Sequence, residues 1–296
     1  MRTLDAGIAA HISGGQTTLA TCWRIERSDG VVLGFTDHDV ALSFGGTDYV
    51  PAHGLDGGEL AQKLGPQTDT TEVVGVLHAE AISEDDILLG RYDGAAVETW
   101  RVNWRDTSQR YLVRRATIGE IVREDGVFRA ELRSPQHALN VVKGRRYQAL
   151  CDAALGDARC GIDLEDPDFK AEGSVAEIRD RFHLTVNGTG GYAVGWFGFG
   201  HVVWTTGKRE GLRDTIVSHQ RIGGADVLSF DKPVGEWVEA DDEMTLYAGC
   251  DRRFETCRER FANAANFRGF PHIPGNDLIM RVTKRGDRLD GGALFR

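Results

Sequence analysis

Apolar and polar side chains alternate along several stretches of the first half of the chain, which is the pattern of β-strands with one buried face. A Ser-Asp-Gly turn at residues 28–30 separates the first two stretches, and a Glu-Asp-Gly turn at 124–126 separates the last two. The segments of this half that we expect to be strands are Thr18–Ile25, Val31–Phe35, Tyr49–Val50, Thr71–His78, Ala95–Trp104, Arg110–Val122 and Val127–Leu132.

Helix signals in the first half are short. Residues 4–12 form a weakly amphipathic stretch, and Ser83 precedes three acidic residues, as an N-cap does before an acidic first turn. Gly90 is expected to end that helix. Ser134 followed by Pro135 is a second N-cap signal and predicts a short helix over His137–Val142.

A second block with β patterning runs from Ala171 to Tyr247, after the acid-rich linker Asp163–Asp168. Residues 250–262 are polar and helix-prone, and the tail from Asn266 is expected to be extended. The fold class is therefore mainly β, with two antiparallel barrel or sandwich units and short helices. We expect three parts, namely residues 1–165, 166–248 and 249–296. The strands expected in the second block are Gly173–Ile178, His183–Val186, His201–Thr205, Thr215–Ile222 and Val227–Phe230.

Composition and charge exclude several classes of protein. The 296 residues carry 35 basic and 45 acidic side chains, a net charge of −10, which argues against a duplex-DNA binder. The segment Met1–Ser13 lacks the apolar core of a signal peptide, and no run of 18 apolar residues predicts a membrane span. We therefore expect the chain to begin in a reducing cytoplasm, where clustered cysteines are metal ligands or reactive thiols more often than disulfides.

Four of the five cysteines form two pairs in polar, turn-rich surroundings, Cys151 with Cys160 and Cys250 with Cys257. Four thiolates from two distant segments suit an all-cysteine metal site. The ordinary interpretation, buried structural cysteine, is preferred for Cys22 in its strand.

The spacing within the pairs bears on the choice of metal. Structural zinc usually takes cysteines separated by two to four residues, whereas these pairs are separated by eight and six. Two cysteines seven positions apart on one helix lie about 10 Å apart along its axis, so they reach one centre only if the first precedes the helix. A multi-iron cluster is wider, so the spacing favours iron–sulfur over zinc, and zinc stays the alternative.

Beyond the cysteines, the C-terminal motif resembles the signature of a phage tail-tip family, the baseplate hub proteins of long-tailed siphophages and gene transfer agents, of which the lambda tail-tip protein L is a distant member. The run Tyr247–Phe261 carries this resemblance, together with Asn263, Asn266–Pro271 and Ile273–Gly275. The N-terminal piece Leu33–Asp39 is similar to the gene transfer agent branch.

The resemblance implies a structural protein of the virion tail baseplate, assembled in the bacterial cytoplasm, and not an enzyme. It implies a [4Fe–4S] cluster on Cys151, Cys160, Cys250 and Cys257 that staples the C-terminal helical segment. It also implies two tail-tube-like β units per chain and a homotrimer that matches a sixfold tube to a threefold tip. The implied partners are the distal tail protein or tail tube above, and the central tail-tip fibre protein and a tail peptidase below. DNA would only pass through the lumen, without stable membrane insertion.

Two enzymatic alternatives are open: a cytosolic four-cysteine iron–sulfur or zinc enzyme, and a tail-associated cell-wall hydrolase. The segment Asp37-His38-Asp39 is the nearest to a catalytic group, but neighbouring strand residues point to opposite faces, so a polar turn at a strand end is preferred.

Two further stretches also have a functional and an ordinary interpretation. The glycine- and aromatic-rich stretch Gly188–Trp204 is either an exposed contact loop or β-barrel core with glycine bends, and we prefer the core. The arginines between 252 and 260 alternate with acidic residues, which favours a solvated or interface helix over a nucleic-acid patch.

Overall fold

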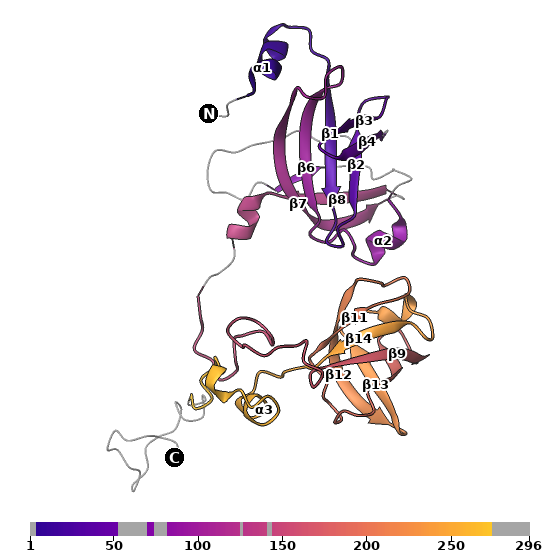
Figure 1. The fold of residues 1–296 in the computed structure, drawn as a ribbon, viewed down its shortest axis with the longest axis vertical. Coiled ribbons are helices and arrows are strands. Elements are labelled where there is room, and N and C mark those ends of the chain that lie inside the picture. The colour runs from indigo at the N-terminus through magenta and orange to yellow at the C-terminus, as the bar shows by residue number, and fades with distance from the viewer. Residues whose placement is uncertain (1–3, 53–69, 74–81, 125–126, 141–143, 274–296) are drawn as a thin grey trace, which may run out of the picture. The chain divides into compact units, whose positions relative to one another are not determined.

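The computed structural model describes residues 4–52, 70–73, 82–124, 127–140 and 144–273 (Figure 1). The chain divides into two compact units, residues 1–143 and 144–296. Each unit is built on one β-sheet with few helices, so the mainly-β prediction is confirmed. This division places residues 144–165 in the second unit. The three expected parts, with boundaries at 165 and 248, stay a prediction.

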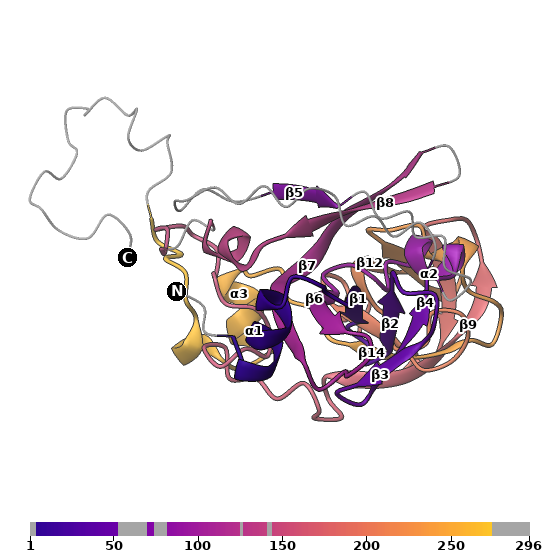
Figure 2. The ribbon, with the colours of Figure 1, turned by 90° about the horizontal axis from the view of Figure 1, so that it is seen from above.

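The first unit contains an eight-stranded sheet in the order β3-β4-β2-β1-β6-β7-β8-β5. The predicted long strands are present, and β5 pairs with β8 at one edge, where Figure 2 shows the two side by side. The expected strand from Thr71 lies outside the described residues beyond 73. The bounds are β1 Leu19–Glu26, β2 Val32–Thr36, β3 Leu42–Phe44, β4 Thr47–Pro51, β5 Thr70–Val73, β6 Ala96–Asn103, β7 Arg110–Glu124 and β8 Val127–Arg133.

One strand pair of this sheet is parallel, which differs from the antiparallel prediction. Phe35 of β2 lies opposite Val50 of β4 in parallel register. The three-residue strand β3, which the sequence pattern did not predict, pairs with β4 through a turn at Gly45 and Gly46, both at positive φ. The chain thus reverses twice between β2 and β4, so the two strands run in the same direction.

Strand β1 is buried on both faces. Trp23 packs with Phe35 and Val97 in one apolar cluster, and Cys22 packs with Tyr49 and Val102 in another. Cys22 is fully buried, and its thiol donates a hydrogen bond to Thr36 Oγ1. The prediction of a buried structural cysteine at this position is therefore confirmed.

Short helices flank the sheet. In α1 (Ala6–Ser13) the carboxylate of Asp5 accepts from Gly7 N. In α2 (Glu84–Leu88) Ser83 accepts from Asp86 N, as predicted. Gly90, at a φ of 75°, follows α2. The helix expected after Ser134 is instead a 3₁₀ turn, η1 (Pro135–Leu139), in which Ser134 makes no capping bond; residues 141–142 of that prediction lie outside the described residues.

The second unit is a closed six-stranded barrel in the order β10-β13-β12-β11-β14-β9. Its interior is filled by apolar side chains such as Trp204, Leu228 and Met244, so it is a packed core. Strand β14 was not predicted. The bounds are β9 Lys170–Ile178, β10 His183–Asn187, β11 His201–Trp204, β12 Arg213–Ile222, β13 Ala225–Phe230 and β14 Glu243–Tyr247.

The remaining elements of this unit are α3 (Phe254–Glu259) and the 3₁₀ turns η2 (Val234–Glu236) and η3 (Ala264–Asn266). Figure 1 shows α3 beyond the end of β14, outside the barrel wall. In the part of the chain that the structure describes, no helix has the length and apolar character that a membrane crossing requires.

Candidate metal centre

The closure of the barrel brings the two cysteine pairs to one place. Strands β9 and β14 pair antiparallel with Lys170 opposite Tyr247, and Ala248 N donates to Phe169 O at 2.7 Å. The segment that enters β9 and the segment that leaves β14 therefore lie together at the same end of the barrel. The first segment carries Cys151 and Cys160, and the second carries Cys250 and Cys257.

Backbone hydrogen bonds connect the pairs directly. Cys151 N donates to Arg252 O at 2.8 Å, and Arg252 N donates to Cys250 Sγ at 3.3 Å. Cys250 precedes α3 and Cys257 lies within it, which is the arrangement that their spacing requires for both sulfurs to approach one centre.

All four thiols lie in one electrostatic neighbourhood. Burial, together with smaller contributions from Cys250, Cys151 and Cys160, raises the pKa of Cys257 to about 11. Burial also raises the pKa of Cys250, with smaller contributions from Cys151 and Cys160. Each thiol of the second pair is thus within electrostatic range of both thiols of the first.

The four thiols as placed do not form a ligand set for a single metal ion. Among the described residues, no three His, Cys, Asp or Glu side chains are arranged to hold one metal ion. Sulfurs around a single zinc must lie within roughly 4 Å of each other, because each Zn–S bond is about 2.3 Å. The choice of an iron–sulfur centre over zinc stays a prediction.

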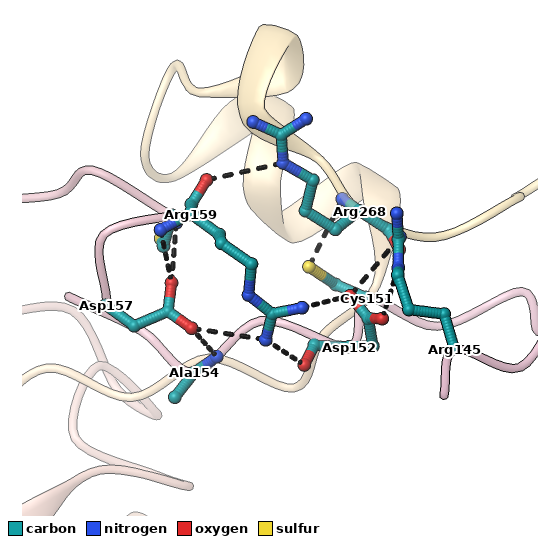
Figure 3. Close-up of polar contacts among 8 residues, drawn as sticks. Arg145, Cys151, Asp152, Ala154, Asp157, Arg159 and Arg268 are labelled. Atoms are coloured by element: carbon teal, nitrogen blue, oxygen red, sulfur yellow. Dashed lines mark hydrogen bonds and ion pairs between the residues drawn. The ribbon is translucent and has the colours of Figure 1, made fainter. Parts of the chain in front are cut away.

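A frame of arginines and aspartates holds the loop of the first pair (Figure 3). Asp157 accepts from Cys160 N at 2.7 Å, and this backbone N–H is the main reason that the pKa of Asp157 is lowered. Arg145 and Arg159 both bond to Asp152, next to Cys151. The loop is ordered by these contacts around the two sulfurs.

The C-terminal segment closes over the same loop. Arg268 N donates to Cys151 Sγ at 3.4 Å, and Arg268 O accepts from Arg145 Nη2 at 2.9 Å (Figure 3). Phe270 N donates to Gln148 O at 2.9 Å. The tail was expected to be extended from residue 266, and most of it lies outside the described residues. Its described part, residues 267–273, docks against residues 145–151.

Helix α3 is fastened to the barrel by an arginine and three aromatic rings. The guanidinium of Arg260 lies 5.1 Å from the ring centroid of Trp196 and donates to Gly249 O at 3.1 Å. Phe261 packs against both Phe169 and Trp196, which also stack on each other. Arg260 therefore packs within the second unit, and the expectation of a solvated or interface helix stays a prediction.

The glycine- and aromatic-rich stretch Gly188–Trp204 contains residues of the barrel core and residues exposed to solvent. Phe197 and Trp204 are buried in the barrel core, as preferred. Val194 and Phe199 are exposed, and Phe199 has a φ of 63°. The core interpretation is thus confirmed for the part that joins and forms β11, whereas the tip of the loop faces solvent.

The segment Asp37-His38-Asp39 forms a polar turn after β2. Asp37 accepts from Thr21 N at 2.7 Å, and His38 Nδ1 accepts from Val40 N at 3.0 Å. Asp37 is thus bonded to β1 and His38 to its own turn, in agreement with the preferred interpretation of a polar turn at a strand end.

Sequence reasoning did not single out two residues that support the cysteines, Asp157 and Asn263. Asp157 lies three positions before Cys160, a spacing at which an aspartate side chain bonds to later backbone N–H groups. Asn263 belonged to the C-terminal motif, but nothing in that pattern indicated its contact with Cys160.

Comparison with known proteins gives matches over most of the chain. Residues 5–163 match the family model described as "Baseplate hub protein, N-terminal attachment domain", and residues 195–277 match "Phage conserved hypothetical protein BR0599". No curated protein matches the chain. Among solved structures, the chain is similar to a protein from the structure titled "Virion of native gene transfer agent (GTA) particle". The two are 39% identical with a TM-score of 0.88, and the match covers 98% of this chain and 100% of that one.

Proposed function

The chain belongs to the baseplate hub protein family of phage-like tails, and from this premise we propose that it is the structural hub of a tail of the gene transfer agent or siphophage type. The observation that carries the proposal is the match to the gene transfer agent virion protein, which extends over nearly the whole length of both chains. A hub of this kind acts mechanically and not as an enzyme.

In this role three copies form a ring that joins the tail tube and distal tail protein to the tail-tip fibre protein and a tail peptidase. The two β units of each chain are the tube-like parts of the ring, and DNA passes through its lumen. The excess of ten negative charges suits such a conduit, because an acidic lining repels the phosphates of passing DNA.

The four cysteines hold a [4Fe–4S] cluster in this proposal, with zinc as the alternative. The donor set fits: four thiols share one neighbourhood, and the backbone N–H groups of Arg252 and Arg268 donate to sulfur. Bound there, the cluster would cross-link the segment before β9 to the segment after β14. Its binding free energy would then add to the folding free energy of this half of the chain.

Assembly tests the hub proposal. The purified chain of 32.5 kDa should have the mass of three copies by light scattering, alone or with its tail partners, and antibodies against it should label the tail tip in electron micrographs. Particles produced without this chain should have tails that lack the tip. Normal tips in such particles would contradict the proposal.

Metal analysis tests the cluster proposal separately. Protein purified without oxygen should contain iron and acid-labile sulfide in equal amounts, about four of each per chain, and be brown. A result of zinc without sulfide would indicate that the four thiolates bind a zinc ion and not an iron–sulfur cluster. Protein with neither metal would contradict both, while leaving the assembly result unaffected.

A further inference from the structure

Asn263 returns to the cysteines after the chain has left α3. Ala262 adopts a left-handed conformation with a φ of 48°, which reverses the chain direction. Asn263 N then donates to Cys257 O at 2.9 Å. The reversal places Asn263 beside the last cysteine of the second pair.

The polar groups of Asn263 connect both cysteine pairs. Its side-chain Nδ2 donates to Cys160 O at 2.7 Å and approaches Cys160 Sγ at 3.7 Å, across 103 residues of sequence. Its backbone carbonyl accepts from Cys257 Sγ at 3.3 Å. The backbone oxygen of Cys160 can only accept, so chemistry requires that the NH₂ end of the amide faces Cys160. Asn266 Nδ2 donates to the opposite end, Asn263 Oδ1, at 2.8 Å.

We infer that Asn263 is a positioning residue of the four-cysteine centre, which holds the loop of Cys160 against the backbone of Cys257 and supplies an N–H donor to the Cys160 sulfur. This inference rests on the proposed function. An N–H donor next to sulfur shifts the reduction potential of a bound cluster. Groups that orient metal ligands in this way typically contribute about 10- to 100-fold to metal affinity.

Two substitutions separate the donor from the rest of the side chain. Asn263→Asp keeps the shape and the acceptor for Asn266, but it loses the NH₂ group and adds negative charge beside sulfur. Asn263→Ala removes the side chain without adding charge. Asn266→Ala is the control, because its amide contacts Asn263 and not a sulfur.

The measurements use the full chain, loaded with iron and sulfide under anaerobic conditions. Both Asn263 variants should lose iron to a chelator about 10-fold faster than the wild type. Asn263→Asp should also have a more negative reduction potential than Asn263→Ala, a difference that general loosening of the fold would not produce. Asn266→Ala should resemble the wild type in both measurements. Wild-type rates and potential in both Asn263 variants would overturn the inference.

A second measurement separates this inference from the metal proposal. If the wild-type chain holds no iron and sulfide, alkylation of the metal-free thiols decides whether Asn263 positions them. Asn263→Ala should then speed the alkylation of Cys160 several-fold, because the Asn263 side chain no longer holds the Cys160 loop, with the rate at Cys151 as internal reference. Unchanged rates would overturn the positioning role, and thermal unfolding of each variant verifies that the barrel is intact.

Discussion

Cys151 donates its backbone N–H to the carbonyl oxygen of Arg252 at 2.8 Å, and this bond joins the two segments that carry the cysteine pairs. The N–H of Arg252 donates in turn to Cys250 Sγ. The backbone of Arg252 makes both bonds at a φ of 64°, which lies in the left-handed region that residues other than glycine rarely adopt. The peptide groups of this residue, and not its guanidinium, therefore carry its contribution to the site.

Substitutions at Arg252 test the role of its backbone. Arg252→Gly should preserve both bonds and stabilise the chain by up to about 1 kcal/mol, because glycine has no left-handed penalty. Arg252→Val should destabilise it by about 1 kcal/mol or more. Thermal unfolding measures both. Arg253→Gly is the control, since Arg253 has an ordinary φ of −81° and offers no strain to relieve. Equal destabilisation by Gly and Val at position 252 would contradict the prediction.

Cysteine substitutions should divide by position. If the proposed cluster is bound, Cys151→Ser and Cys257→Ser should lose iron and sulfide and make residues 144–169 and 250–273 more sensitive to protease, because each removes one of its four proposed ligands. Cys22→Ser should keep full metal content, since Cys22 lies in the core of the other unit. Metal analysis with limited proteolysis provides the measurement, and equal metal content in the three variants would refute the ligand assignment.

A buried ion pair inside the barrel should be sensitive to loss of one partner. Asp214 accepts from Trp204 Nε1 at 2.7 Å and from two nitrogens of Arg209 at 2.6 and 2.8 Å. Asp214→Ala leaves the buried guanidinium without its counter-charge and should lower the free energy of unfolding by about 3–5 kcal/mol in urea.

The exposed pair Arg181–Glu236 is the matched control for Asp214. Glu236→Ala should cost less than about 1 kcal/mol, because water screens an exposed pair. A similar cost for the two substitutions would show that burial does not determine the effect.

The stability of the second unit should fall with acid in two steps. Burial, aided by the positive charge of Arg213, lowers the pKa of His201 from 6.5 to about 4. As the pH falls, His201 is therefore protonated in the unfolded chain before it is protonated in the folded chain. The corresponding stability is present above pH 6.5 and is lost as the pH falls toward about 4. A second loss follows between pH 3.8 and about 2, because Arg221 lowers the pKa of Asp226.

Urea unfolding across this pH range measures the first step. His201→Gln should flatten the dependence between pH 6.5 and 4 without abolishing it, because burial also lowers the pKa of His219. An unchanged slope in the variant would show that His201 does not contribute.

Local pattern was a good guide to some elements and not to others. The strand over residues 19–26 and the capped helix after Ser83 were predicted because their signals, alternation and an N-cap, lie within one element. The strands β3 and β14 were not predicted, although β10 and β11, which are as short, were, so length alone does not explain the difference. The parallel pairing of β2 with β4 depends on the intervening β3 and so escaped the same reasoning.

The sequence by itself determined the mainly-β class, the burial of Cys22, the two cysteine pairs and the resemblance to the baseplate hub family. Only the tertiary structure decided that β9 and β14 close the barrel side by side and so bring Cys151 and Cys160 to Cys250 and Cys257. It also decided that Asn263 reaches Cys160. Side-chain periodicity records which face of one element is buried, whereas contacts between distant segments depend on backbone hydrogen bonds between strands, which no local pattern contains.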